Sequence, residues 1–179
     1  MTDIDIQNLK SLLKSKEEIN KQYTDSNGQL KNPDELKKYP TFDTTSEELN
    51  NENFEPLNID GRKKRITLYV SNLGRIKYND EILHQVEEVK NSDNDNKTIK
   101  GYLQIDKEKH KELWTEIPDE QYKYVYQLVA KVWCEKPKLC PKCEKCPIEI
   151  HHKDNDGYNN SAANLTYLTK CEHKEVHSK

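Results

Sequence analysis

The sequence predicts an α+β protein with an N-terminal helix, a β-rich middle module and a C-terminal ββα finger that binds metal. Three observations support this fold class: an amphipathic run near the N-terminus, short apolar runs separated by turn signals in the middle, and four of the six histidines within the last 29 residues. We expect a helix and polar linker in 1–60, a β-rich module ending in a helix in 61–137, and the finger in 138–179.

The N-terminal region begins with residues 5–22, in which apolar side chains recur at helical spacing. This spacing predicts an amphipathic helix. Residues 24–55 are polar and contain Asn-Gly and Asn-Pro turn signals. We therefore expect a loop-rich linker here, with one short helix at 33–38.

The middle region predicts several strands followed by a helix. Residues 65–83 predict two strands around a turn at 71–74, and further strands are expected near 85–90 and at 98–105. A helix is expected from about Asp119 onward. We interpret its apolar stripe as core, formed by Tyr122, Val125, Tyr126, Val129, Val132 and Trp133.

The histidines of the last region have a spacing from which chemistry can be derived. His173 and His177 are four residues apart, so on a helix both imidazoles can bind one cation, with His151 as a third ligand. Adjacent residues of a strand point to opposite faces, so His152 cannot share that ion with His151. This leaves His152 as the candidate general base for phosphodiester hydrolysis.

Residues 139–179 resemble the HNH family of endonucleases, whose core is a ββα-metal finger. The resemblance implies a general base at His152, an orienting Asn164, metal positions at His151 and His173, and His177 as the third ligand found in colicin-type nucleases. The strings YVSNLGRIK, GYLQI and YVYQLVAKVW are similar to the module that precedes the finger in phage and intron homing endonucleases. The implied activity is metal-dependent DNA cleavage at specific sites, of the restriction or homing type.

Other interpretations of the same residues stay open. The competing class is a zinc-stabilised, non-catalytic DNA-binding module in which the histidines and cysteines are structural, and a third is a phage or plasmid interaction protein with a decayed finger. Asn164 alone would be a turn residue, and Asp154 and Asp156 are interpreted as loop formers. The catalytic cation is not determined by the sequence: imidazole ligands suit Mn, Ni, Co or Zn, whereas related nucleases often use Mg.

The cysteines predict a second, structural zinc site. Four thiolates could form it: Cys140, Cys143, Cys146 and Cys171. Many HNH proteins carry paired C-x-x-C knuckles, but here Thr169 and Glu172 stand where those relatives have cysteines, so the ligand set is open. Disulfides are the alternative. We interpret Cys134 as a small buried hydrophobe.

Charge is distributed unevenly along the chain. Residues 1–55 hold seven lysines against twelve acidic residues, a balance of −5, and the remainder has a balance of +2. We expect double-stranded DNA as the partner and phosphate contacts from Arg62, Lys63, Lys64, Arg65, Arg75 and Lys77. The alternative is that these are solvated surface groups. A homodimer is left open.

Composition limits the cellular setting. Hydrophobic residues make up 32% of the 179, and charged residues 34%, which predicts small cores. No run reaches the roughly 18 apolar residues of a membrane span. The first residues are polar and charged, so we expect no secretion signal and a cytoplasmic protein with reduced cysteines.

Overall fold

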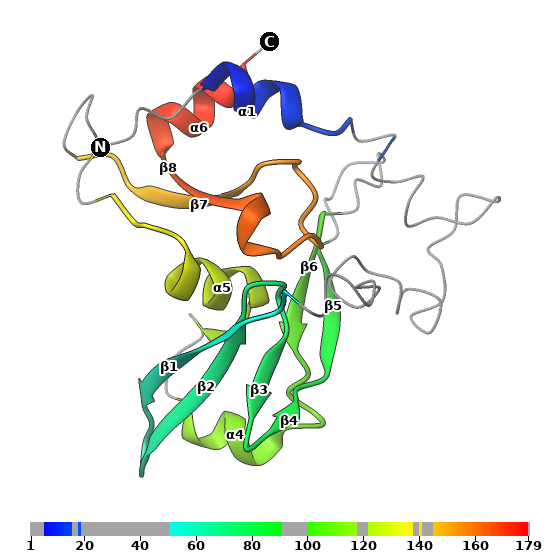
Figure 1. Cartoon of the computed structure of the whole chain (residues 1–179), viewed down its shortest axis with the longest axis vertical. Coiled ribbons are helices and arrows are strands. Elements are labelled where there is room, and N and C mark those ends of the chain that lie inside the picture. Colours follow the sequence, from blue (N-terminus) through cyan, green and yellow to red (C-terminus); the bar gives the residue numbers. More distant parts are fainter. Residues whose placement is uncertain are drawn as a thin grey trace.

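The computed structural model describes residues 6–15, 18, 51–90, 100–117, 122–137, 140 and 145–178. Among these residues it has four α-helices and three antiparallel sheets, so the α+β class is confirmed (Figure 1). The predicted helix at 33–38, the first two residues of the strand predicted at 98–105, and Cys143 lie outside the described residues. No helix in the described part of the chain combines the length and apolar character needed to cross a membrane.

The largest sheet has the strand order β1-β2-β3-β4. Its strands are β1 (Phe54–Asp60), β2 (Arg65–Ser71), β3 (Ile76–Tyr78) and β4 (Glu81–Ile82). The predicted pair of strands around 71–74 corresponds to β2 and β3. Asn79 and Asp80 both have positive φ, at 49° and 64°, as a two-residue hairpin turn requires, and they make the additional strand β4 feasible.

Strand β1 was not predicted, because its residues were assigned to the polar linker. Its buried side chains, Leu57 and Ile59, alternate with polar ones, and Pro56 interrupts the pattern. Proline is tolerated here because β1 lies at the edge of the sheet, where one backbone donor can be lost.

The next segment forms a second sheet and two helices. Its elements are β5 (Gln85–Lys90), β6 (Lys100–Ile105), α4 (Lys111–Glu116) and α5 (Val125–Trp133). The strands agree with the sequence prediction, whereas α4 was not predicted. The expected start near Asp119 lies outside the described residues. Tyr124 is extended and forms a β-bridge with Gln104, so α5 itself begins at Val125.

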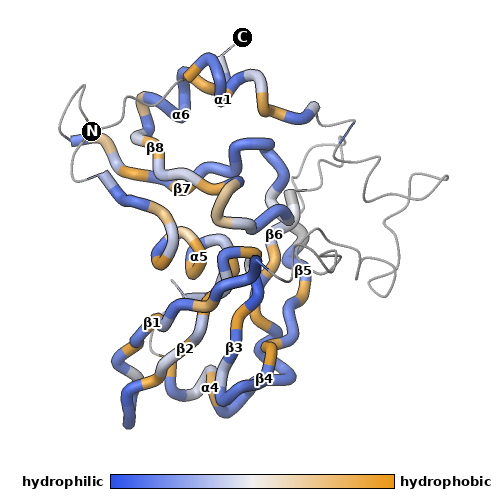
Figure 2. The backbone as a smooth tube through the Cα atoms, in the orientation of Figure 1, coloured by the Kyte–Doolittle hydropathy of each residue, from blue (hydrophilic) through white to orange (hydrophobic). Residues whose placement is uncertain are grey.

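Helix α5 occupies the centre of the molecule, between the β1–β4 sheet and the C-terminal hairpin (Figure 1). The buried residues of α5 are Val125, Leu128, Val129 and Ala130. Two of them, Leu128 and Ala130, lie outside the predicted stripe. Apolar residues recur along α5 (Figure 2), and the helix contacts strands of all three sheets. The same hydrophobic cluster continues into the C-terminal hairpin through Leu165 and other residues.

The C-terminal region forms the strand, strand and helix that the sequence predicts. The elements are β7 (Ile148–His152), the 3₁₀ turn η3 (Ala162–Asn164), β8 (Leu165–Thr169) and α6 (Lys170–Val176). The strands are antiparallel, with His152 opposite Leu165 and Ile148 opposite Thr169. Thr169 and Glu172 form a capping box that starts α6 immediately after β8.

Helix α1 (Ile6–Leu12) ends inside the predicted helix at 5–22, of which residues 5, 16–17 and 19–22 lie outside the described part of the chain. The backbone leaves the helix after Leu12, and Ser15 and Glu18 exchange the reciprocal hydrogen bonds of a capping box, at 2.7 and 3.2 Å. A capping box is a sequence signal that the apolar spacing alone does not reveal. Leu9 of α1 packs in a small cluster with Leu168 and Val176, so the N-terminal helix lies against α6 (Figure 1).

Candidate metal centre

The pleat of β7 divides its side chains between two environments. Glu149 and His151 lie on the face covered by α6, where both approach its histidines. Ile148, Ile150 and His152 lie on the other face, toward α5 and the main core. The neighbouring histidines 151 and 152 are therefore separated by the hairpin itself, as the sequence predicts.

Three histidines converge beneath α6. The ring of His151 lies 5.1 Å from that of His173 and 5.2 Å from that of His177, and the last two rings are 4.8 Å apart, measured between centroids. One ring nitrogen from each of the three lies within 4.8 Å of the others. This is a donor set that one cation could bridge.

His151 has the properties of a ligand. Its side chain is 3% exposed, and within the described residues its Nε2 has no hydrogen-bond partner. Burial, together with repulsion from His173 and His177, lowers the pKa of His151 to about 3. The imidazole is thus neutral at physiological pH and keeps the lone pair that a metal requires. These residues fit a divalent cation.

Glu149 supports the same cluster and was missed by the sequence analysis. Its Oε2 lies 3.0 Å from Nδ1 of His173, which leaves Nε2 of that histidine available to an ion. A carboxylate on the second ring nitrogen orients a metal-binding imidazole and raises its basicity. The two-residue alternation of β7, which puts Glu149 on the face of His151, was the available signal.

His152 lies in an aromatic environment between β6, α5 and the loop that connects β7 to β8. Its ring centroid is 5.4 Å from that of Tyr126 and 6.1 Å from that of Tyr102. Its Nε2 is 3.0 Å from Oδ1 of Asn160, a residue that the sequence analysis did not select. Because an amide oxygen only accepts, Nε2 carries the proton and Nδ1 the lone pair. Burial lowers the pKa of His152, which also keeps the ring neutral.

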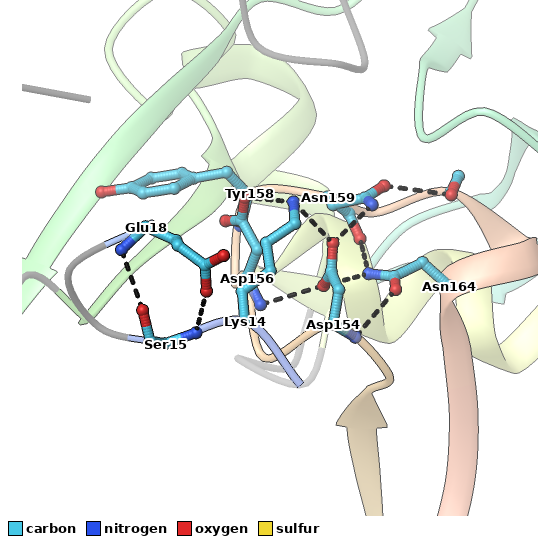
Figure 3. A network of polar contacts seen from close by, with 9 residues as sticks. Lys14, Ser15, Glu18, Asp154, Asp156, Tyr158, Asn159 and Asn164 are labelled. Atoms are coloured by element: carbon cyan, nitrogen blue, oxygen red, sulfur yellow. Dashed lines mark hydrogen bonds and ion pairs between the residues drawn. The ribbon is translucent and has the colours of Figure 1, made fainter. Parts of the chain in front are cut away.

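Asn164 holds the loop that connects β7 to β8. Its Oδ1 accepts from the Asp154 N–H at 3.1 Å, and its Nδ2 donates to Oδ1 of Asp154 and to the carbonyl of Asn159, both at 2.8 Å (Figure 3). The Asp156 N–H donates to Oδ1 of Asp154, and the Tyr158 N–H donates to Oδ1 of Asp156. Both aspartates thus form the loop, in agreement with the sequence prediction.

The far side of this loop is fixed by Tyr158. This side chain is 1% exposed and lies over Gly101 of β6, where a Cβ would overlap the phenol ring. Its hydroxyl donates to Glu87 of β5. The loop is therefore anchored to the second sheet as well as to Asn164.

Three of the candidate zinc ligands also converge. One Sγ from each of Cys140, Cys146 and Cys171 lies within 4.8 Å of the others, and the last two are 2.9 Å apart. Cys146 precedes β7 and Cys171 lies in the first turn of α6, so this cluster is at the opposite end of the hairpin from His151. Cys134 is separate: its Sγ is 3.7 Å from the Leu165 carbonyl, and burial raises its pKa.

The basic residues selected from the sequence are in different environments. The four that follow Gly61 are exposed, although Lys63 pairs with Glu116 and Arg65 lies 3.9 Å from Asp60. Arg75 is paired with Glu52. Lys64, Arg65 and Lys77 line a shallow groove on the outer face of the β1–β3 sheet, with Phe54 and Tyr69 among its other residues.

Comparisons of this chain with protein-family models, with curated proteins and with solved structures find no match. The functional interpretation accordingly rests on the chemistry and geometry of the two clusters.

Removal of a histidine ligand should abolish tight cation binding. We expect His151→Ala to weaken Co²⁺ or Mn²⁺ binding by at least about 100-fold, and Glu149→Gln by about 10-fold, because one removes a donor and the other only its orienting partner. Isothermal titration calorimetry measures both. His84→Ala, outside the cluster and paired with Asp106, is the control. Equal affinities in all four proteins would contradict the assignment.

The cysteine cluster should carry zinc independently of the histidines. We expect one zinc per chain by elemental analysis of the purified His151→Ala protein, and a lower thermal midpoint with loss of that zinc in Cys171→Ser, since a structural site contributes to folding. Cys134→Ser should retain its zinc. A zinc-free wild-type protein, or zinc retained after Cys171→Ser, is inconsistent with this site.

Proposed function

We propose that the protein is a metal-dependent DNA endonuclease of the HNH type that hydrolyses phosphodiester bonds, with site specificity of the restriction or homing kind. The single observation that carries this proposal is that two adjacent histidines at the end of β7 lie on opposite faces of the strand. His151 joins His173 and His177 in a cation-binding cluster, while the adjacent His152 lies on the other face and remains outside it.

In the proposed mechanism, His151, His173 and His177 would hold a divalent cation. When bound, this cation supplies positive charge that stabilises the scissile phosphate and the leaving oxygen. His152 takes a proton from the attacking water at Nδ1, while Asn160 holds the opposite ring nitrogen. Asn164 keeps the loop next to His152 in one conformation through its bonds to Asp154 and Asn159.

The donor set favours particular cations. Three imidazoles suit Mn, Co, Ni or Zn better than Mg, which prefers oxygen ligands. The second site, with Cys140, Cys146 and Cys171, is proposed for structural zinc. Cys143, the fourth thiolate expected from the sequence, lies outside the described residues.

The groove on the outer face of the β1–β3 sheet is the proposed contact for the DNA backbone. Lys64, Arg65 and Lys77 supply positive charge at its walls, and Tyr69 is 44% exposed there. Lys77 also lies 4.6 Å from the centre of the Phe54 ring, which orients its ammonium group on the sheet surface. Arg75 does not belong to this set, because its guanidinium pairs with Glu52.

A non-catalytic, zinc-stabilised DNA-binding module is the second candidate function. The observation in its favour is the burial of His152, whose side chain is 7% exposed and hydrogen-bonded to Asn160. A purely structural histidine would have these properties. In that case the protein would shift DNA in a gel without cutting it.

Replacement of the candidate base separates these two functions. We expect wild-type protein to nick or linearise plasmid DNA with Mn²⁺, Co²⁺ or Ni²⁺, and His152→Ala to lose cleavage by at least about 100-fold, the lower range for a general base. Metal affinity and DNA affinity should be retained, because His152 is outside the cation cluster. His110→Ala is the matched control. Full cleavage by His152→Ala would defeat the mechanism, and DNA binding without cleavage by the wild type would support the module.

Neutralisation of the groove should weaken DNA binding through its salt dependence. We expect the triple change of Lys64, Arg65 and Lys77 to Gln to reduce the slope of log affinity against log salt by about 3, since each lost phosphate contact removes roughly 0.9. Fluorescence anisotropy with duplex DNA measures this slope. Lys111→Gln on α4, which is exposed and does not line the groove, should leave it unchanged. An unaltered slope in the triple variant would exclude this face.

A further inference from the structure

Lys14 links the N-terminal segment to the loop of the candidate catalytic site, although the two lie near opposite ends of the chain. Its backbone N–H donates to the Asp154 carbonyl at 2.9 Å. Its Nζ lies 3.2 Å from Oδ2 of Asp154 and 3.8 Å from Oδ2 of Asp156 (Figure 3). One lysine therefore makes both a main-chain and a charged contact with the loop.

The carboxylates that face Lys14 are buried. Asp154 is 9% exposed and Asp156 is 0% exposed. Two carboxylates so close together repel each other, and their removal from water is costly unless cations and hydrogen bonds compensate. Burial raises the pKa of Asp154, but hydrogen bonds within the loop and the charge of Lys14 lower it more, so that its net pKa is below the ordinary value.

The position of Lys14 is itself determined by packing. Leu9 of α1, five residues before Lys14, is 6% exposed and packs against Leu168 and Val176. Because α6 also carries two of the metal-binding candidates, α1 contacts both the histidine helix and the loop. Lys14 follows the end of α1 at Leu12 and directly precedes Ser15, and both its backbone N–H and its ammonium group contact Asp154.

The conformation of this loop determines the positions of the candidate catalytic residues. Asp154 both donates a hydrogen bond to Asn164, from its N–H, and accepts one from it, at Oδ1. The Asn155 N–H donates to the His152 carbonyl at 2.9 Å. A change in the position of Asp154 would thus move the end of β7, where His152 lies. Charge repulsion between Asp154 and Asp156 would produce such a change if no cation lay beside them.

We propose that Lys14 is a positioning residue for the candidate active site: its ammonium group balances the charges of Asp154 and Asp156, and it thereby holds Asn164 and the His152 end of β7 in place. The N-terminal segment then contributes to the candidate active site, in addition to packing against α6. The kinetic consequence of this inference rests on the proposed nuclease function. Its consequence for loop order does not.

Charge removal at Lys14 tests the inference. We expect Lys14→Met to lower kcat for plasmid cleavage by about 10-fold to 100-fold, as small displacements of reacting groups do, with KM and metal affinity unchanged. Lys14→Arg should retain most of the activity. Lys10→Met is the matched control, since Lys10 belongs to the same N-terminal segment, on α1, but contacts Ser178, at 3.5 Å. Asp156→Asn should restore part of kcat in the Lys14→Met protein, because it removes one of the charges to be balanced.

Amide hydrogen exchange provides a readout that needs no cleavage. The N–H groups of Asp156 and Tyr158 are bonded to loop carboxylates, so they should exchange faster in Lys14→Met than in Lys10→Met. Unchanged exchange together with wild-type kcat in Lys14→Met would overturn the inference. If the wild type cleaves with none of the cations, the nuclease proposal fails, and the exchange rates alone decide the role of Lys14. Where Lys14→Met does not fold, Lys14→Gln takes the same tests.

Discussion

The burial of both faces of the β7–β8 hairpin is the constraint on which the rest of the structure depends. One face packs against α5 and the other lies beneath α6. Because side chains alternate along a strand, a shift of one residue would exchange His151 and His152 between these environments. Ile148 and Ile150 resist that shift, since it would move both from the apolar core to the polar side. The separation of ligand and candidate base is thus enforced by hydrophobic packing.

Polar interactions order the part of the finger that the core does not reach. The loop between the hairpin strands has few apolar groups, and its conformation depends on the bonds of Asn164 and Asp154 and on the insertion of Tyr158 over Gly101. Such a network is stable only if each buried charge has a partner. Lys14 meets part of this requirement from the other end of the chain, which explains how a chain with 32% hydrophobic residues can order a long loop.

The C-terminal elements could be predicted because their signals are local. The apolar residues beside His151, the turn-forming residues from Asp154 onward and the helical spacing of His173 and His177 each specify structure within a few positions. The β2–β3 pair and strands β5 and β6 were predictable for the same reason. The convergence of the three histidines also follows from periodicity, once the strand and helix are placed together.

The missed features depend on contacts between distant segments. Strand β1 exists because β2 offers it a partner, and α5 starts late because Tyr124 is bridged to Gln104. Asn160 and Lys14 gain their roles only when the loop folds back on His152 and α1 docks on α6. The break after Leu12 was different, since the Ser15–Glu18 capping box is a local signal that could have been read. The sequence analysis used the apolar spacing alone.

The cysteine cluster and the histidine cluster of the C-terminal region differ in the metal ions that they would prefer. Thiolates are soft ligands that retain zinc, whereas a cluster of imidazoles with a carboxylate behind it accepts several divalent ions. Cys146 lies two residues before β7 and Cys171 lies in the first turn of α6, so an ion held between them would fix the angle between strand and helix. That angle sets the separation of His151 from His173 and His177. A zinc ion at the thiols would therefore preorganise the histidines for a second, exchangeable cation, which couples the stability of the finger to the site that performs the proposed chemistry.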